Sequence, residues 1–241
     1  LPILSQATGI PLLGINHLEG HIYAPWLFED EPGALPEFPI LALLVSGGHT
    51  ELDLVPDHLD YRRLGGTLDD AAGEAFDKVA RMLGLGYPGG PAIQNCAMSG
   101  NPTAIHFPRA LLDNSWDFSF SGLKTAVLRV VNRYQQTGQE LPAADVAASF
   151  QAAVVDVLVT KAIRAVEVTG AKSLLLAGGV SANKALRQEI IEKSPVPVFI
   201  PSMKFCTDNA AMIGAAGFFR YQTGIQSMMS MEVKPSWRLS G

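Results

Sequence analysis

One short pattern occurs twice in the chain and constrains its fold more than any other feature. Residues 43–50 read Leu-Leu-Val-Ser-Gly-Gly-His-Thr, and residues 174–181 read Leu-Leu-Leu-Ala-Gly-Gly-Val-Ser. Each joins an apolar run, typical of a buried strand, to a small residue, two glycines and, one position on, a hydroxyl residue. Because glycine lacks the Cβ that would block a ligand, backbone N–H groups in such turns can approach one closely. Two such turns on one sheet favour a nucleotide site, although two ordinary tight turns would give the same pattern.

The remaining apolar periodicity predicts a chain of mixed α/β class. Strands are predicted at 11–15, 40–45, 50–55, 61–66, 173–177 and 196–200. Helices are predicted at 17–28, 70–83, 91–99, 122–136, 143–168, 182–193 and 207–222, and an acidic, proline-rich linker at 29–39. Three antiparallel strands followed by helices and further α/β units is the order of one lobe in actin-like ATPases, an analogy that does not fix function.

Composition excludes several classes of protein. The 241 residues are 48% hydrophobic, enough for a large core. The two cysteines, Cys96 and Cys206, lie far apart, which excludes a disulfide scaffold and fits the reducing cytoplasm. The net charge of −5 predicts no general affinity for phosphate backbones, so nucleic acid would be bound by local basic groups. We expect no membrane location, because no uncharged apolar run is long enough to span one and no signal peptide opens the chain.

Two histidines are candidate metal ligands. His17 and His21 lie one helical turn apart, so their imidazoles share one face of the predicted helix. Asp208, at the start of the last predicted helix, is a candidate third ligand but could equally cap that helix. Glu19 stands between the histidines, unlike the glutamate of zinc-peptidase motifs, which disfavours a peptidase. Spacing alone leaves a metal site and an ordinary polar helix face both open.

Other motifs carry less information. The glycines at 84, 86 and 89 have dinucleotide-binding spacing but follow a predicted helix instead of a strand, so we reject that interpretation. The stretch 69–78, Asp-Asp-Ala-Ala-Gly-Glu-Ala-Phe-Asp-Lys, predicts a helix capped by its aspartates with a Glu74–Lys78 ion pair. Spacing alone assigns no role to Asp77.

Taken together, seven strings closely resemble, in order, the tRNA N6-adenosine threonylcarbamoyltransferase family in its bacterial form. They are Asn16–His21, Leu44–Thr50, Asp69–Lys78, Tyr87–Pro91, Asp117–Thr125, Gly178–Asn183 and Phe205–Asn209. The resemblance spans essentially the whole chain, and the ordered set is far more specific than any one string. It implies an actin-like, ribonuclease H-like duplicated α/β fold, of which this chain would hold the end of the first lobe and a complete second lobe.

The resemblance also implies a division of the chain. Residues 1–38 would be the C-terminal remnant of lobe I with the metal-binding helix. Residues 39–223 would be lobe II, which binds nucleotide and substrate and carries a helical insertion at about 89–168, and residues 224–241 a C-terminal segment. Members of the family normally begin with a further segment that includes a phosphate-binding hairpin, which this sequence lacks. We therefore expect the 241-residue chain alone to be inactive in group transfer.

The activity implied is transfer of the threonylcarbamoyl group from threonylcarbamoyl-AMP to N6 of the adenosine beside the anticodon, in tRNAs that read codons starting with A. His17, His21 and Asp208 would hold one Fe²⁺ or Zn²⁺ per chain. The adenine nucleotide, as threonylcarbamoyl-AMP, ATP or ADP, would be held by Leu44, Val45, Ser46, Gly47, Gly48, Asp77, Gly90 and Asn183. Gln94 departs from the family pattern, since many members have a substrate-contacting aspartate at that position.

The implied partners are tRNA, a smaller paralogous actin-like subunit, an accessory ATPase subunit and the threonylcarbamoyl-AMP synthase that supplies the substrate. Lys124, Arg129 and Arg133, on the helix predicted at 122–136, are candidate tRNA contacts. Three alternatives stay open: an actin-like kinase or ATPase, a carbamoyltransferase of hydrogenase maturation, and a truncated, non-catalytic scaffold for the paralogous subunit. The histidine pair disfavours the kinase, because such enzymes hold Mg²⁺ through carboxylates, water and phosphate.

Overall fold

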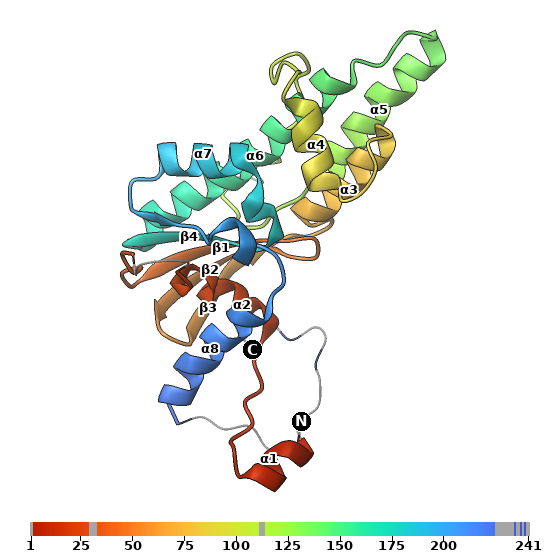
Figure 1. Cartoon of the computed structure of the whole chain (residues 1–241). Coiled ribbons are helices and arrows are strands. Elements are labelled where there is room, and N and C mark those ends of the chain that lie inside the picture. The colour runs from red at the N-terminus through yellow and green to blue at the C-terminus, as the bar shows by residue number, and fades with distance from the viewer. Residues whose placement is uncertain are drawn as a thin grey trace.

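A five-stranded mixed sheet forms the centre of the computed structural model, with its strands in the order β3-β2-β1-β4-β5 (Figure 1). The structure describes residues 2–28, 33–110 and 114–224, together with residues 234, 237 and 239. β1 pairs antiparallel with β2 and parallel with β4, while β3 is antiparallel to β2 and β5 parallel to β4. The strands are β1 (Ile40–Val45), β2 (Thr50–Asp57), β3 (Asp60–Gly66), β4 (Ser173–Ala177) and β5 (Val198–Phe199).

Helices cover both faces of this sheet. α2 and α8 pack together on one face, α6 and α7 lie on the other, and α3, α4 and α5 extend to one side (Figure 1). The described α-helices are α1 (Pro2–Thr8), α2 (His17–Tyr23), α3 (Ala72–Met82), α4 (Gly89–Ala97), α5 (Ser121–Thr137), α6 (Ala143–Thr169), α7 (Lys184–Lys193) and α8 (Ala210–Gln222). Short 3₁₀ helices are η1 (Ala24–Trp26), η2 (Gly179–Ala182) and η3 (Met203–Phe205).

Strand β1 contributes to the core on both faces of the sheet. Leu41 and Leu43 belong to a large apolar cluster that includes residues of α3 to α7, whereas Ala42 and Leu44 face a smaller cluster with Leu18 of α2. Successive side chains of a strand point to opposite faces, so a strand covered on both sides needs apolar residues throughout. This explains the continuous apolar run at 40–45.

The sequence correctly predicts an α/β chain, but several element boundaries were wrong. Residues 11–15 form no strand; Ile15 instead packs beside Gly217 of α8. The helix that begins at His17 ends at Tyr23 and continues as η1. Pro25 has no N–H to donate to the carbonyl oxygen of His21, so the α-helical hydrogen-bond pattern stops there. The strand predicted at 196–200 shortens to β5, and the last two helices begin later, at 184 and 210. The linker lacks regular structure at 33–39, and its residues 29–32 lie outside the described part, as do most of 224–241.

Helix α6 is the one helix of the described residues that is long and apolar enough to cross a membrane. However, 72% of its most apolar window is buried inside the molecule. Its buried residues, among them Phe150, Val154 and Leu158, belong to the large core cluster. A helix that is apolar on most sides is the expected centre of a helical layer, so the composition of α6 is explained by its place in the core.

Asp53 of β2 is a buried carboxyl group that forms no hydrogen bond through either oxygen. Burial, reinforced by the charge of Glu51, raises its pKa to about 7. An aspartate in an unfolded chain has a pKa near 4, so the folded state binds this proton more tightly than the unfolded state does. The free energy of unfolding should therefore fall as the pH rises from about 4 to about 7, and the loss is complete above that.

We expect Asp53→Asn to raise the free energy of unfolding at pH 8 by about 1–4 kcal/mol and to change it much less at pH 4. Urea denaturation across this pH range would measure the difference. Asp60→Asn is a matched control, because Asp60 is exposed on the neighbouring strand β3 and should leave the pH profile nearly unchanged. A loss of stability at pH 8 in Asp53→Asn would contradict the prediction.

Candidate metal and nucleotide site

The two glycine turns lie together at one edge of the sheet. β1 and β4 are parallel neighbours, so the turn Ser46–Gly48 after β1 and the turn Gly178–Ser181 after β4 leave the sheet at the same edge. In sheets of this kind ligands bind outside the carboxyl ends of the strands. The sequence repeat thus produces a pair of turns where a nucleotide site is expected.

The glycines of these turns are of two kinds. Gly178 has φ +90°, and a Cβ on it would lie 2.5 Å from the carbonyl oxygen of Val45, so the turn after β4 touches the end of β1. Gly73, in the first turn of α3, donates its N–H to the Ser46 carbonyl oxygen at 3.2 Å. A Cβ on Gly73 would lie 2.5 Å from that oxygen. In contrast, a Cβ on Gly48 or Gly179 would meet nothing within 4 Å. The first kind is required by packing, and the second leaves open space for a ligand.

The three predicted metal ligands meet at one point. The Nε2 atoms of His17 and His21 each lie 3.2 Å from Oδ1 of Asp208. Two donors about 2.0–2.1 Å from one ion lie about 3.0–3.4 Å from each other, which matches both His–Asp distances. All three donor atoms lie within 4.8 Å of one another, so they form a candidate site for a single metal ion. Three protein donors, two of them on exposed residues, leave coordination positions open for substrate oxygens. The donor set therefore fits Fe²⁺ or Zn²⁺.

Local capping explains how the chain places these ligands. Asn16 caps α2 by accepting a hydrogen bond from Leu18 N at 2.9 Å, so the helix begins at His17. Asn209 caps α8 by accepting one from Met212 N at 2.9 Å. The alternative reading of Asp208 as the helix cap is therefore wrong, and its carboxylate is available to face the histidines.

The electrostatic environment favours the neutral form of His21. Burial, then the neighbouring His17, lower the pKa of its imidazole, while Asp208 partly offsets them; His49 also lowers it. Neutral imidazole is the form that binds metals. Leu18 of α2 packs in one apolar cluster with Leu44 and Ala177, near the carboxyl ends of β1 and β4, so α2 lies on the side of the sheet from which the two glycine turns leave.

Glu19 has a structural role. It is fully buried, and its carboxylate accepts hydrogen bonds from Arg220 Nε at 2.7 Å and from the Tyr61 hydroxyl at 2.9 Å. These contacts join α2 to α8 and β3. The glutamate is thus not among the converging donors, in agreement with the expectation that the motif is not that of a peptidase.

The predicted nucleotide residues Asp77 and Gly90 lie beside each other. Asp77 Oδ1 accepts a hydrogen bond of 2.7 Å from Gly89 N, which begins α4, and Gly90 follows directly. The side chains of Leu44 and Val45 are buried within β1, so these two residues can offer a ligand only their backbone. The accessible part of the first turn begins at Ser46.

Asn183 is engaged within the protein. Its Oδ1 caps α7 by accepting from Leu186 N at 3.0 Å, and its Nδ2 donates to Gln151 Oε1 at 2.8 Å. Gln94, the departure from the family pattern, accepts a hydrogen bond from Lys184 N at 2.7 Å. Both polar side chains therefore support the start of α7, and a ligand would have to share or replace these bonds. Gln151 was not predicted, because its contact joins residues far apart in the sequence.

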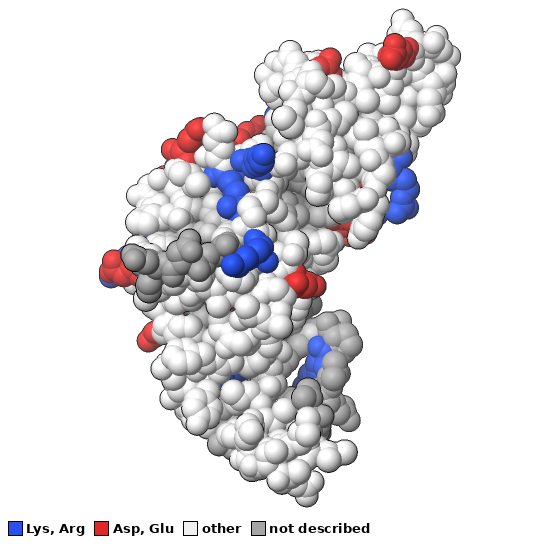
Figure 2. Space-filling view, in the orientation of Figure 1, with Lys and Arg blue, Asp and Glu red and all other residues white. Residues whose placement is uncertain are grey.

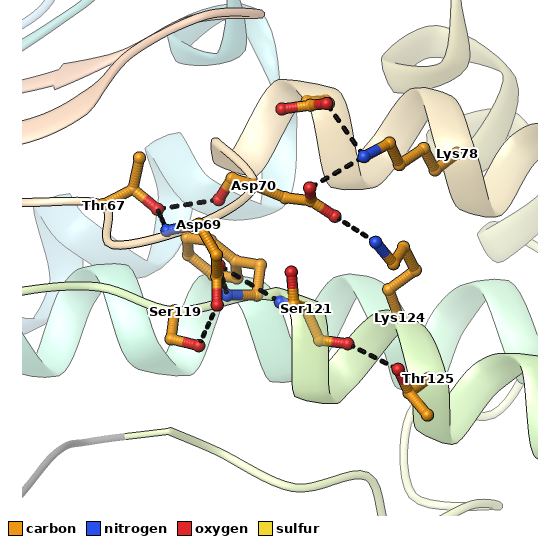
Figure 3. A network of polar contacts seen from close by, with 10 residues as sticks. Thr67, Asp69, Asp70, Lys78, Ser119, Ser121, Lys124 and Thr125 are labelled. Carbon is orange, nitrogen blue, oxygen red and sulfur yellow. Dashed lines mark hydrogen bonds and ion pairs between the residues drawn. The ribbon is translucent and has the colours of Figure 1, made fainter.

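The sequence predicted that Asp69 and Asp70 cap α3, and this prediction is wrong. Thr50 Oγ1 accepts from Ala72 N at 2.9 Å in their place. Asp69 instead caps α5, accepting from Phe120 N at 2.8 Å, Ser121 N at 3.2 Å and Ser119 Oγ at 2.6 Å (Figure 3). A carboxylate at a helix N-terminus is stabilised by its free N–H groups and its dipole.

Asp70 joins α3 to α5. Its two oxygens bind Lys78 of α3 and Lys124 of α5, each at 2.7 Å (Figure 3). The predicted Glu74–Lys78 ion pair is confirmed at 2.8 Å and shares the same lysine. Since the first turn of α3 also contacts Ser46, this network fixes α5 relative to the glycine turn.

A mixed sheet with paired glycine turns and a converging His-His-Asp donor set defines an α/β protein with a candidate metal and nucleotide site. Two solved structures share this fold. Full-length HypF in its phosphate- and nucleotide-bound form has a TM-score of 0.66 and 16% sequence identity, and the match covers 92% of this chain and 44% of HypF. HypF of T. kodakarensis has a TM-score of 0.67 and 15% identity, and the match covers 92% of this chain and 38% of that protein. The chain itself belongs to the tRNA N6-adenosine threonylcarbamoyltransferase family, whose sequence model matches residues 3–215.

Relatives in that family are close along most of the chain. The tRNA N6-adenosine threonylcarbamoyltransferase of Dehalococcoides mccartyi is 54% identical over 233 residues, which cover 97% of this chain and 69% of the relative. The enzyme of Moorella thermoacetica is 54% identical over 241 residues, covering 98% and 69%. That of Thermomicrobium roseum is 53% identical over 244 residues, covering 92% and 67%.

Proposed function

We propose that this chain transfers the threonylcarbamoyl group from threonylcarbamoyl-AMP to N6 of the adenosine beside the anticodon, in tRNAs that read codons starting with A. It is an acyltransferase by family. The observation that carries the proposal is the convergence of His17, His21 and Asp208 beside the two glycine turns. The reaction takes place in the cytoplasm.

The chemistry requires one carbonyl to be activated and one nucleotide to be held. When bound, iron or zinc supplies Lewis-acid polarisation of the threonylcarbamoyl carbonyl. In the two turns the N–H groups of Gly47, Gly48 and Gly179 bind the phosphate, because those of Ser46 and Ser181 donate within their own turns to the carbonyl oxygens of His49 and Gly178. Asp77 and Asn183 bind the ribose and neighbouring polar groups of the nucleotide. The adenosine N6 then attacks the carbonyl carbon, the bond to the phosphate oxygen breaks, AMP leaves and N6 loses one proton. Holding both reactants in line supplies much of the acceleration.

The finer architecture follows from the same proposal. Residues 1–38 belong to the first lobe of a duplicated actin-like fold, residues 39–223 to the second, and 89–168 form a helical insertion. A smaller paralogous subunit and an accessory ATPase complete the assembly, and a threonylcarbamoyl-AMP synthase supplies its substrate. Support comes from the family match and the HypF-like fold.

The alternatives are weaker on specific grounds. A kinase or ATPase would need carboxylates at its metal site, and the converging donors of the described residues are mostly imidazoles. A hydrogenase-maturation role has only fold similarity at 15–16% identity, against 54% for the tRNA-modifying relatives. The scaffold reading does not explain why an intact donor triad persists.

The proposal is tested with the protein as its gene encodes it, supplied with Fe²⁺ or Zn²⁺, the paralogous and accessory subunits, threonylcarbamoyl-AMP and unmodified tRNA. Mass spectrometry of the digested nucleosides should show threonylcarbamoyladenosine and release of an equal amount of AMP. Phosphate release from ATP without nucleoside modification would favour the ATPase instead.

Contacts with tRNA are expected on the exposed face of α5. Arg129 and Arg133 are exposed one turn apart, whereas Lys124, also predicted as a contact, is held by Asp70. Figure 2 shows basic side chains in small separate groups, which fits the net charge of −5. A few local contacts must therefore carry the electrostatic attraction.

We expect the double variant Arg129→Glu, Arg133→Glu to weaken tRNA binding about 10-fold or more and to reduce its salt dependence. Fluorescence titration over a range of salt concentrations would measure both effects. The double variant Lys172→Glu, Lys193→Glu serves as the charge-matched control, because both lysines are exposed and lie outside α5, and it should change tRNA binding little. Equal affinity in the arginine double variant and the wild type would refute this surface.

A further inference from the structure

Arg187 of α7 contacts both sides of the candidate site. Its Nε donates to the carbonyl oxygen of Ser181 at 2.6 Å, in the turn after β4. Its Nη2 donates to the Pro201 carbonyl oxygen at 2.6 Å and contacts Cys206 Sγ at 2.9 Å. Cys206 lies two residues before Asp208. One guanidinium therefore connects the nucleotide turn to the segment that carries a metal ligand.

The partners of Arg187 are all neutral. Within the described part of the chain it forms no ion pair, although it is only partly exposed. Removing a guanidinium from water is costly, and a carboxylate partner would offset that cost better than carbonyls do. What a guanidinium offers here is its rigid planar fork, which fixes several acceptors in one plane. The arrangement therefore serves geometry more than charge pairing.

The segment that Arg187 contacts leads directly to Asp208 and is also held by Asn209, whose Nδ2 donates to the Phe205 and Thr207 carbonyl oxygens. Asp208 is exposed and outside α8, so no helical hydrogen bond fixes it. The other hydrogen bonds of Cys206 go to Pro201 and Ser202 in its own segment. Arg187 thus ties this segment to α7 and, through Ser181, to the turn after β4.

We propose that Arg187 is a positioning residue that couples metal binding to nucleotide binding. This inference rests on the proposed function, because it takes the triad and the turns as the two ligand sites. A nucleotide that orders the turn at 178–181 fixes the Ser181 carbonyl, and the same guanidinium then fixes Cys206 and the approach to Asp208. By linkage, a metal ion must strengthen nucleotide binding by the same factor.

The test measures both affinities by calorimetry on the protein as its gene encodes it, with Zn²⁺ and ADP as probes. In the wild type each ligand should tighten the other about 5- to 50-fold. In Arg187→Lys, which keeps the charge and loses the fork, this factor should fall to about 1–2. Cys206→Ala, which removes one contact and keeps the guanidinium, should reduce it in the same direction.

A matched control separates coupling from general loosening. Arg109 is also partly buried and donates to Asp156 and to the Phe107 carbonyl oxygen, which belong neither to the two turns nor to the segment before Asp208. Arg109→Lys should leave the coupling factor unchanged. Undiminished coupling in both Arg187→Lys and Cys206→Ala, or no coupling in a wild type that binds both probes, overturns the inference but not the proposed function. A wild type that binds neither probe overturns the proposed site itself.

Discussion

Gly178→Ala is expected to lower the free energy of unfolding by roughly 3 kcal/mol or more. Gly178 has φ +90° and ψ 166°, a region open essentially to glycine alone. A methyl group there would lie 2.5 Å from the Val45 oxygen, in the backbone of the central strand β1. Since that strand is covered on both faces, it has little room to shift. Urea denaturation followed by circular dichroism would measure the loss.

The neighbouring glycine is the control for this prediction. A Cβ on Gly179 meets nothing within 4 Å, so Gly179→Ala should change the free energy of unfolding by less than about 1 kcal/mol. It should nevertheless weaken ADP binding, because the methyl group occupies the open space beside the turn. Equal destabilisation by the two substitutions would show that the division into packing and ligand-facing glycines is wrong.

Arg220→Met is expected to cost about 3–5 kcal/mol of stability, because it leaves the buried carboxylate of Glu19 without its cation. Tyr61 would remain as a hydrogen-bond donor. Burial and the charge of Glu19 raise the pKa of its hydroxyl far above the usual range, so it stays protonated but cannot neutralise the carboxylate. The same change should weaken metal binding, since Glu19 lies on α2 between the two histidine ligands. Thermal or urea unfolding, with metal titration, would record both.

Two further variants show whether burial is the cause. Arg62→Met removes an arginine whose ion pair with Asp60, at 3.4 Å, is exposed, and should cost less than about 1 kcal/mol. Adding Glu19→Gln to Arg220→Met should restore part of the lost stability, since no unpaired charge then remains. Equal losses for Arg62→Met and Arg220→Met would contradict the assigned role of the buried pair.

The sequence predicted best where one physical requirement dominates. The runs at 40–45 and 173–177 match β1 and β4 to the residue, because a strand covered on both faces must be apolar throughout. The run at 196–200 contains Pro197 and is followed by Pro201, and only Val198 and Phe199 pair, at the edge of the sheet next to β4. Proline cannot donate a hydrogen bond to a neighbouring strand, so the two prolines favour a short edge strand, which the prediction from apolar character alone overestimated.

The site was predictable in part. Helical spacing placed His17 and His21 together, but the choice of Asp208 as ligand over helix cap came from the family resemblance, and the structure explains it through the cap at Asn209. The sequence assigned no correct role to Asp69 or Arg187, because their partners are distant in the chain. Ser119 lies 50 residues from Asp69, and Cys206 lies 19 residues from Arg187. Such contacts follow from the tertiary fold and leave no local pattern.

The central claim is that His17, His21 and Asp208 hold one transition metal ion on which transfer depends, and metal content per chain tests it most directly. The purified protein as its gene encodes it should contain about one iron or zinc, and its His21→Ala and Asp208→Ala variants should contain almost none and modify no tRNA. His106→Ala, at an exposed histidine between α4 and α5, should retain both metal and activity. An unchanged metal content in both ligand variants would contradict the account.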